Sequence, residues 1–338
     1  MKAFIELNLL RTKFILLLLL FTALQGKSQS FAPQVGLKGS TAIYKDSSVF
    51  IDWAVSCQIH RGYIDISNST ETDTVSFGIA KNALGAPGGT MDVVSLGDGG
   101  YAILSFHYPI VDGPGPDFAV FENGFLKNNN PYNAFVELAF VEVSEDGENY
   151  YRFPAISELP TDKQIGTFDG IDARYIHNLA GKYIANYGTP FDLTELKKIY
   201  PNLNINNINY VKIVDVIGAI NSPFTTYDYY GNPINDPYPT PFASGGFDLD
   251  AVGVIHNSLT TQKNNFVIFP NPVQKFLTII PLKKQKFNLQ IITLDGRIIY
   301  QIQSNRSIKL PINQNFKPCF IIRITTDKIC IIKKIIAI

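Results

Sequence analysis

Six oxygen-bearing side chains lie in three short segments of the sequence, and their types suit a cation such as calcium. Asp112 and Asp117 flank a Gly/Pro-rich turn, and Asp248 and Asp250 are two residues apart, so they can share one face of a strand. Calcium takes about six to eight oxygen ligands from carboxylates, amides and carbonyls. We therefore expect a structural calcium site, the alternative being ordinary turn aspartates. The candidate ligands are Asp112, Asp117, Glu122, Asn123, Asp248 and Asp250.

A loop rich in Pro, Asn and Asp carries five aromatic side chains. Long loops are uncommon in compact domains and are often functional where they occur. Exposed rings beside Asn and Asp suit a sugar, or another small ligand that has an apolar face. The alternative is a loop that packs its aromatic side chains against itself. The predicted ligand-binding residues are Tyr227, Tyr229, Tyr230, Tyr238 and Phe242.

The support for catalysis is weaker than the support for binding. Paired carboxylates can hydrolyse glycosides, and the sequence offers Glu122 with Glu137 or Glu142. The latter two lie in an ordinary-looking strand, where we expect glutamates to face solvent. No Gly-x-Ser-x-Gly motif is present to mark a nucleophile, and His177, the best histidine candidate, is expected to be structural. The sequence thus favours a protein that is not an enzyme. A secreted glycosidase-like hydrolase with carboxylate catalysis is one alternative, and a structural or adhesion protein is another.

The elements that position these residues are predicted to be short strands. Asp146-Gly147 lies between two strand-like runs and predicts a hairpin. The best helix candidate is 192–200, with Asp192 as its N-cap. We expect an all-β, jelly-roll-like sandwich with long insertions between about residues 153 and 209. Short runs bounded by Gly, Pro or Asp, as sandwich strands are, occur at 101–106, 117–122, 139–144 and 210–215.

The chain divides into two regions of opposite charge. Residues 29–262 hold 12 basic and 26 acidic residues, a net charge of −14, whereas residues 263–338 hold 13 basic and two acidic residues, a net of +11. The negative charge argues against nucleic-acid binding, which needs a basic face. We expect an acidic surface domain at 29–257, a polar linker at 258–265, and a small antiparallel sandwich of about seven strands at 266–338.

The first 28 residues have the features of a secretory signal peptide. Three basic residues precede the apolar run 14–24, which is too short to cross a bilayer core of ~30 Å comfortably. We expect this segment to be removed and the mature chain to hold no transmembrane segment. The three cysteines do not form a disulfide framework. Cys319 and Cys330 either pair across adjacent strands or are buried thiols.

The C-terminal region resembles the type A sorting domain of the type IX secretion system, which occurs in Bacteroidetes. The resemblance rests on Phe269-Pro-Asn-Pro272, Leu277-Thr-Ile279, Leu294-Asp-Gly-Arg297 and a lysine-rich last strand. It implies that the type IX machinery is a partner and that the protein is secreted or held on the outer cell surface. One departure is Lys317-Pro-Cys-Phe320, where the family usually has Gly-x-Tyr. The implied sorting-motif residues are Pro270, Asn271, Pro272, Asp295, Gly296 and Arg297.

The acidic region is similar to a family of bacterial cell-surface domains that is largely uncharacterised. That family's architecture is related to discoidin-like and carbohydrate-binding jelly rolls, so the similarity implies a fold and not an activity. The combined prediction is a non-catalytic module that binds a glycan or other small extracellular ligand and is steadied by calcium. The similarity rests on 94–100, 112–118, 121–124, 141–144 and 246–250.

Overall fold

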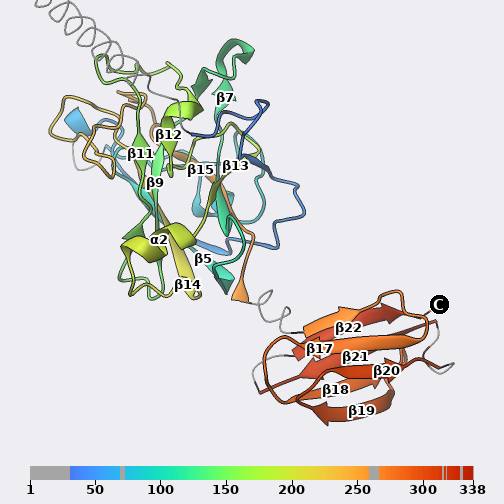
Figure 1. Ribbon diagram of the computed structural model, residues 1–338. Helices are drawn as coiled ribbons and strands as arrows, with labels where there is room; N and C mark the ends of the chain where they lie inside the picture. The colour runs from blue at the N-terminus through green and yellow to red at the C-terminus, as the bar shows by residue number, and fades with distance from the viewer. Residues whose placement is uncertain are drawn as a thin grey trace, which may run out of the picture.

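The computed structural model describes residues 31–68, 73–258, 266–313, 316, 318–327 and 330–337. The predicted signal peptide at 1–28 and nearly all of the predicted linker lie outside these residues. Strands make up 39% of the chain and helices 7%, which confirms the predicted all-β class. Figure 1 shows two β units.

The N-terminal unit is a sandwich of two sheets whose strand pairs are all antiparallel. The first sheet has the order β1 (Ile43–Tyr44), β13 (Tyr187–Phe191), β6 (Phe118–Glu122), β15 (Asp248–Val254) and β2 (Asp52–Trp53), and β4 (Val94–Ser95) also pairs with β15. The second has the order β10 (Tyr151–Arg152), β9 (Ala139–Ser144), β14 (Ile208–Asp215), β5 (Tyr101–Ile110) and β3 (Ser56–His60).

Shorter elements complete this unit. Two small hairpins pair β7 (Phe125–Leu126) with β8 (Ala134–Phe135), and β11 (Ile156–Ser157) with β12 (Ile176–His177). The 3₁₀ turns are η1 (Ile66–Asn68), η2 (Ala80–Ala83), η3 (Lys127–Asn129) and η4 (Ala173–Tyr175).

Local signals in the sequence located several of these elements correctly. The Asp146-Gly147 turn joins β9 to β10, and Gly147 has φ +80°, a conformation that favours glycine. The predicted helix is α2 (Thr194–Ile199), which begins two residues later than expected, and Asp192 accepts a hydrogen bond from the Thr194 amide at 2.9 Å. The predicted insertion was partly wrong, because β13 lies within it and pairs with β6 in a main sheet.

The core lies between the two sheets. On β14, buried Val211 and Ile213 alternate with more exposed residues, as the period of a strand requires. Phe118 stacks on Phe191 with ring centroids 5.4 Å apart. By contrast, β15 is buried along its whole length, because a second apolar cluster that includes Ala251 covers its other face.

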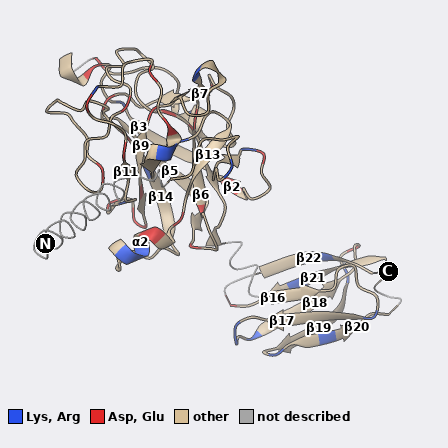
Figure 2. Cartoon of the chain, turned by 45° about the horizontal axis from the view of Figure 1, so that its top comes forward, with Lys and Arg blue, Asp and Glu red and all other residues tan. Residues whose placement is uncertain are grey.

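The C-terminal unit has a core of its own that shares no residue with the first. Figure 2 marks acidic residues in red along the N-terminal unit, which also has basic residues in blue, whereas the charged residues of this unit are mostly blue. One sheet has the order β16 (Phe266–Phe269), β17 (Phe276–Pro281) and β20 (Ile308–Pro311). The other has the order β19 (Ile298–Ser304), β18 (Phe287–Ile292), β21 (Cys319–Thr325) and β22 (Cys330–Ile336).

Both expectations for the cysteine pair were wrong. Strands β21 and β22 are adjacent, but their antiparallel register pairs Cys319 with Ile336 and Cys330 with Thr325. The two thiols therefore lie at opposite ends of the strand pair and are free. Cys330 is exposed and Cys319 is half-buried, so neither is a core thiol.

Candidate functional site

The six predicted cation ligands do not surround one point. Asp117 and Glu122 lie at opposite ends of β6, and five residues of strand span about 16 Å at ~3.3 Å per residue. Asn123 and Asp248 lie at the Glu122 end, where Asn123 Nδ2 donates to Asp248 Oδ2 at 3.0 Å. Asp250 lies at a bulge in β15 and accepts a hydrogen bond from the Gly88 amide at 3.2 Å.

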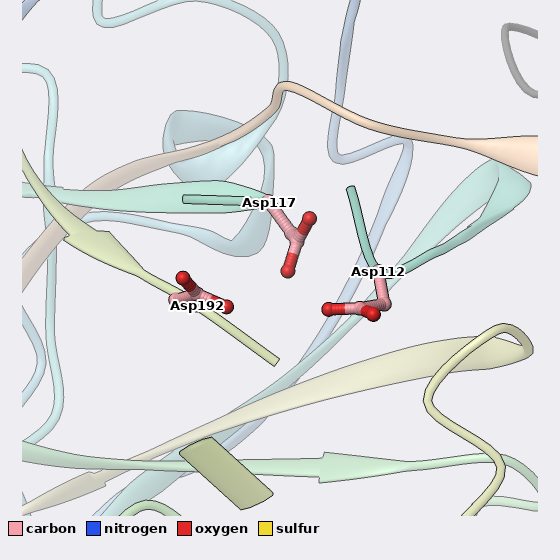
Figure 3. A group of neighbouring side chains, drawn as sticks. All are labelled: Asp112, Asp117 and Asp192. Carbon is pink, nitrogen blue, oxygen red and sulfur yellow. The ribbon is translucent and has the colours of Figure 1, made fainter. Parts of the chain in front are cut away.

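Asp112 and Asp117 do come together, and a third carboxylate joins them. One oxygen each from Asp112, Asp117 and Asp192 lie within 4.8 Å of one another, and Figure 3 shows the three side chains pointing toward a common space. Among the described residues, this is the one group of three potential metal-ligating side chains that is so close. Asp192 was predicted only as a helix cap, so its place here was missed.

Asp117 is the buried member of this group, which we name the triple-aspartate cluster. It accepts hydrogen bonds from the backbone amides of Gly113 at 2.7 Å and Leu193 at 2.8 Å. His256 Nδ1 lies 2.8 Å from Asp117 Oδ1, the same oxygen that accepts from Gly113. Burial raises the pKa of Asp117 to about 6, and these hydrogen bonds oppose the rise. Because its oxygens already have donors, the carboxylate is held in one orientation.

A cavity of about 440 Å³ opens at the Glu122 end of the sandwich, and its size is within the ~300–1,000 Å³ of small-molecule sites. We call it the acid–aromatic pocket. Its polar lining includes Glu137, Asp248 and Asn123, together with Thr and Ser side chains. Its aromatic lining is Phe125, Phe135, Phe168 and Phe242.

Four buried carboxylates gather at and behind the floor of this pocket. They are Glu122, Glu137, Asp236 and Asp248, each at most 8% exposed. Burial raises the pKa values of Glu122, Glu137 and Asp236 well above their usual range, and the charges of neighbouring carboxylates add to the rise. Burial also raises the pKa of Asp248 to about 6, although hydrogen bonds from Ser95 and Asn123 and the charge of Arg61 oppose it. The fold thus holds these four carboxyl groups close together despite the repulsion between their charged forms.

Two of these carboxylates have an oxygen that lacks a hydrogen-bond partner within the described part of the chain. Glu122 Oε2 accepts from the Gly124 amide at 2.7 Å, but its Oε1 is buried and unpaired. Asp236 Oδ2 accepts from the Leu138 amide at 2.9 Å, but its Oδ1 is likewise unpaired. A buried polar atom without a partner destabilises a fold, so each such atom calls for an explanation, and a functional role is one.

The walls of the pocket are two stacked phenylalanine pairs. The rings of Phe125 and Phe135 are 5.3 Å apart, and those of Phe168 and Phe242 are 5.7 Å apart. Phe125, Phe168 and Phe242 are 57%, 68% and 43% exposed, which is unusual for side chains this large. Each pair presents apolar ring faces beside the acidic floor.

The five predicted aromatic residues are divided among different places. Phe242 lines the acid–aromatic pocket, whereas Tyr227 and Tyr229 line a separate cavity of about 150 Å³. Tyr230 is 69% exposed beside Tyr229, and Tyr238 is half-buried. The loop is held in place by buried polar residues, among them Asn235 and Asp236. It therefore contributes a ring to the pocket while it also packs against its own domain.

The two glutamates of the hydrolase alternative have different environments, and the expectation that they face solvent was wrong. Glu142 is buried in ion pairs with Arg152 at 2.7 Å and Lys212 at 3.3 Å, which is a structural arrangement. Glu137 lines the pocket, and no ion pair to it is found in the described part of the chain. Sequence reasoning also missed Asp236 and Phe168, which look like ordinary loop residues.

The predicted sorting-motif residues lie on two turns of the C-terminal unit. The Asn271 side chain accepts from the Ile336 amide at 2.9 Å and donates to the Lys334 carbonyl at 3.2 Å, which ties the Pro-Asn-Pro turn to the last strand. In the Asp-Gly-Arg turn, Arg297 Nε donates to Asp295 Oδ2 at 2.7 Å, and Gly296 has φ +88°. Pro270 and Pro272 flank Asn271.

Comparison with family models identifies this unit. Residues 267–338 match the secretion system C-terminal sorting domain. The chain ends in a type IX sorting domain. The protein is therefore a type IX secretion substrate that is secreted or displayed on the outer cell surface, and the secretion machinery is its partner. The predictions of a sorting domain and of a secreted or surface location are confirmed.

Other comparisons add little about the N-terminal unit. A search of curated proteins found no match. Similar solved structures are β-glucuronidases, with low scores. The apo β-glucuronidase 3 of Bacteroides uniformis is 12% identical over 87% of this chain and 35% of that chain, with a TM-score of 0.26. The Ruminococcus gnavus enzyme in complex with D-glucaro 1,5-lactone is 8% identical over 70% of this chain and 35% of that chain, with a TM-score of 0.21. This chain thus spans about a third of those enzymes, and such scores carry no argument about activity.

No helix in the described part of the chain is long and apolar enough to cross a membrane.

Proposed function

We propose that the N-terminal unit is a non-catalytic, extracellular module that binds a glycan or another small ligand with an apolar face in the acid–aromatic pocket. The observation that carries the proposal is the pairing of exposed rings with polar groups in one cavity. Phe168 and Phe242 offer ring faces, and Asn123, Glu137 and Asp248 offer hydrogen-bonding groups beside them. Sugars present the same combination of an apolar face and a polar rim. Export to the cell exterior is consistent with such a ligand.

A glycan array probed with the full mature chain tests this proposal. We expect at least one glycan class to bind, and Phe242→Ala to weaken that binding at least about tenfold, which corresponds to ~1.4 kcal/mol. Tyr230→Ala is the matched control, because Tyr230 is an exposed ring of the same loop that lies outside the pocket. Equal binding by the two variants would place the ligand elsewhere, and no binding to any glycan would remove glycans as the ligand.

A second candidate function is carboxylate-dependent hydrolysis. Its specific support is that Glu137 and Asp248 both line the pocket and that burial raises the pKa values of both, as a general acid requires. Chromogenic aryl glycosides incubated with the full mature chain would test it. Turnover that Glu137→Gln abolishes would make the protein a hydrolase, whereas binding without turnover supports the non-catalytic module.

The calcium part of the proposal is assigned to the triple-aspartate cluster. Its support is the closeness of three carboxylate oxygens, two of them from predicted ligands, next to the turn that contains Gly113 and its carbonyl. Thermal melting with calcium and then with a chelator tests the assignment. We expect calcium to raise the melting midpoint of the wild type, and Asp192→Asn to remove the increase. A midpoint that does not respond to calcium would contradict the assignment.

A further inference from the structure

The acid–aromatic pocket has charge of only one sign among its lining residues. Among the residues that the structure describes, Glu137 and Asp248 are its titratable lining residues, and none of its lining residues is Lys, Arg or His. Glu122 and Asp236 lie close enough behind them for the carboxylates to repel one another. Glu122 Oε1 and Asp236 Oδ1 are buried without a hydrogen-bond partner among the described residues. A ligand that brings positive charge into the pocket would relieve the repulsion.

The basic side chains near this region have other partners. Arg61 donates to the carbonyls of Phe77, Gly78 and Ser95, although its charge also acts on Asp248. Lys127, near the rim, donates to the Phe168 carbonyl and pairs with Asp169 at 3.6 Å. Neither residue lines the pocket. Within the described residues, Glu137 therefore receives no compensating cation from the protein.

The walls favour an organic cation over a metal ion. Aromatic ring faces carry partial negative charge and attract an ammonium group that lies within about 6 Å of a ring centre. The four lining aromatic residues are all phenylalanines, which have no hydroxyl groups. A metal ion would need several oxygen ligands around one point. Among the described residues, only the triple-aspartate cluster brings three ligating side chains within 4.8 Å, and this pocket does not.

We infer that the acid–aromatic pocket selects ligands that carry an ammonium group, such as a sugar with a free amino group. The inference rests on the proposed function and names the chemical class of its ligand. The ammonium group lies over the carboxylates of Glu137 and Asp248, and the apolar part of the ligand stacks between the Phe125–Phe135 and Phe168–Phe242 pairs. Acetylation of the amine removes the charge and therefore the preference.

Isothermal titration of the full mature chain tests this inference at pH 7, where an amine with a pKa of about 8 is still mostly charged. The pocket carboxyl groups, whose pKa values are raised, ionise more readily at pH 7 than at lower pH. The ligands are glucosamine oligosaccharides, their N-acetylated counterparts and tetramethylammonium, a cation without sugar groups. We expect the free amino form to bind at least about tenfold more tightly than the acetylated form. Glu137→Gln, which keeps the size of the side chain, should remove most of that difference. Glu148→Gln, the same glutamate-to-glutamine change at an exposed residue outside the pocket, should not alter it.

The outcomes separate this inference from the proposed function. Equal or tighter binding of the acetylated form, still dependent on Phe242, would overturn the inference and leave glycan binding intact. Binding of tetramethylammonium alone, dependent on Glu137, would support the cation site and remove glycans as its ligand. No binding of any of the three would overturn the inference. Melting midpoints of the variants, compared with the wild type, show whether a loss of binding comes from misfolding.

Discussion

Replacing Lys182 with methionine should stabilise the N-terminal unit at neutral pH and reduce the pH dependence of its stability. Lys182 is 4% exposed, and its Nζ donates to the Ile176 carbonyl at 2.6 Å. Burial lowers the pKa of Lys182 from 10.5 to about 7, and the charge of Asp172 opposes the change. The folded state therefore disfavours the charged form of the Lys182 amine.

The sign and size of the effect follow from proton linkage. The folded pKa of Lys182 lies below the unfolded one, so the unfolded chain binds more protons between pH 7 and 10.5. Stability must therefore rise with pH across that window. With ~1.4 kcal/mol per pKa unit, the rise from pH 7 to pH 9 is roughly 2 kcal/mol. The charge penalty at pH 7 is roughly 4 kcal/mol. Loss of the bond to the Ile176 carbonyl costs about 1–3 kcal/mol, so a net gain of about 1–3 kcal/mol is expected at pH 7.

Urea unfolding monitored by tryptophan fluorescence tests this prediction. The chain has a single tryptophan, Trp53, which lies in β2 and so reports on the N-terminal unit. Wild type, Lys182→Met and the exposed control Lys81→Met are compared at pH 7 and pH 9. Because all other titratable groups are shared, the difference between wild type and Lys182→Met isolates this amine. If the variant keeps the wild-type difference between pH 7 and pH 9, the reasoning about Lys182 is refuted.

Three further predictions follow from packing and from the separate cores. Gly181→Ala should destabilise the N-terminal unit by more than about 2 kcal/mol, because Gly181 has φ +80° and a Cβ there would lie 1.9 Å from the Glu137 carbonyl oxygen. The control is Gly231→Ala, at φ +83° with no described atom within 4 Å of the added Cβ. It should cost about 1 kcal/mol in the same urea assay. Phe118→Ala should cost about 3–5 kcal/mol in that assay, since the ring is fully buried between the sheets, and a loss under 1 kcal/mol (roughly) would contradict this packing. Deleting 266–338 should leave the tryptophan-monitored unfolding midpoint unchanged, because the two cores share no described residue. Cell fractionation should find the truncated protein retained inside the outer membrane. Export of the truncated chain would contradict the sorting role.

Features encoded by a few neighbouring residues could be predicted from the sequence. The Asp146-Gly147 turn and the strand that ends at Ser144 are local patterns, and both were found where expected. The Pro-Asn-Pro and Asp-Gly-Arg turns likewise identified the sorting domain. By contrast, β13 was placed in an insertion, because its Gly-Thr-Pro sequence resembles a loop and only pairing with β6 makes it a strand.

The candidate site depended on contacts that have no local pattern. Glu137 was expected to face solvent, but it is buried, and the charges of Asp248 and Asp236, about a hundred residues further along the chain, act on it. Phe168 and Phe242 meet from two loops. The separation of Asp117 from Glu122, however, follows from the length of the strand between them.

The amino-acid sequence alone determined the all-β class and the export of this protein, because strand periodicity, turn residues and sorting motifs act over short stretches of chain. Tertiary structure decided which carboxylates and rings share a cavity, and which aspartates share a cluster. The physical reason is that burial and charge repulsion depend on distance in space. Only the packed sandwich brings Glu137 beside Asp248, or Asp192 beside Asp117.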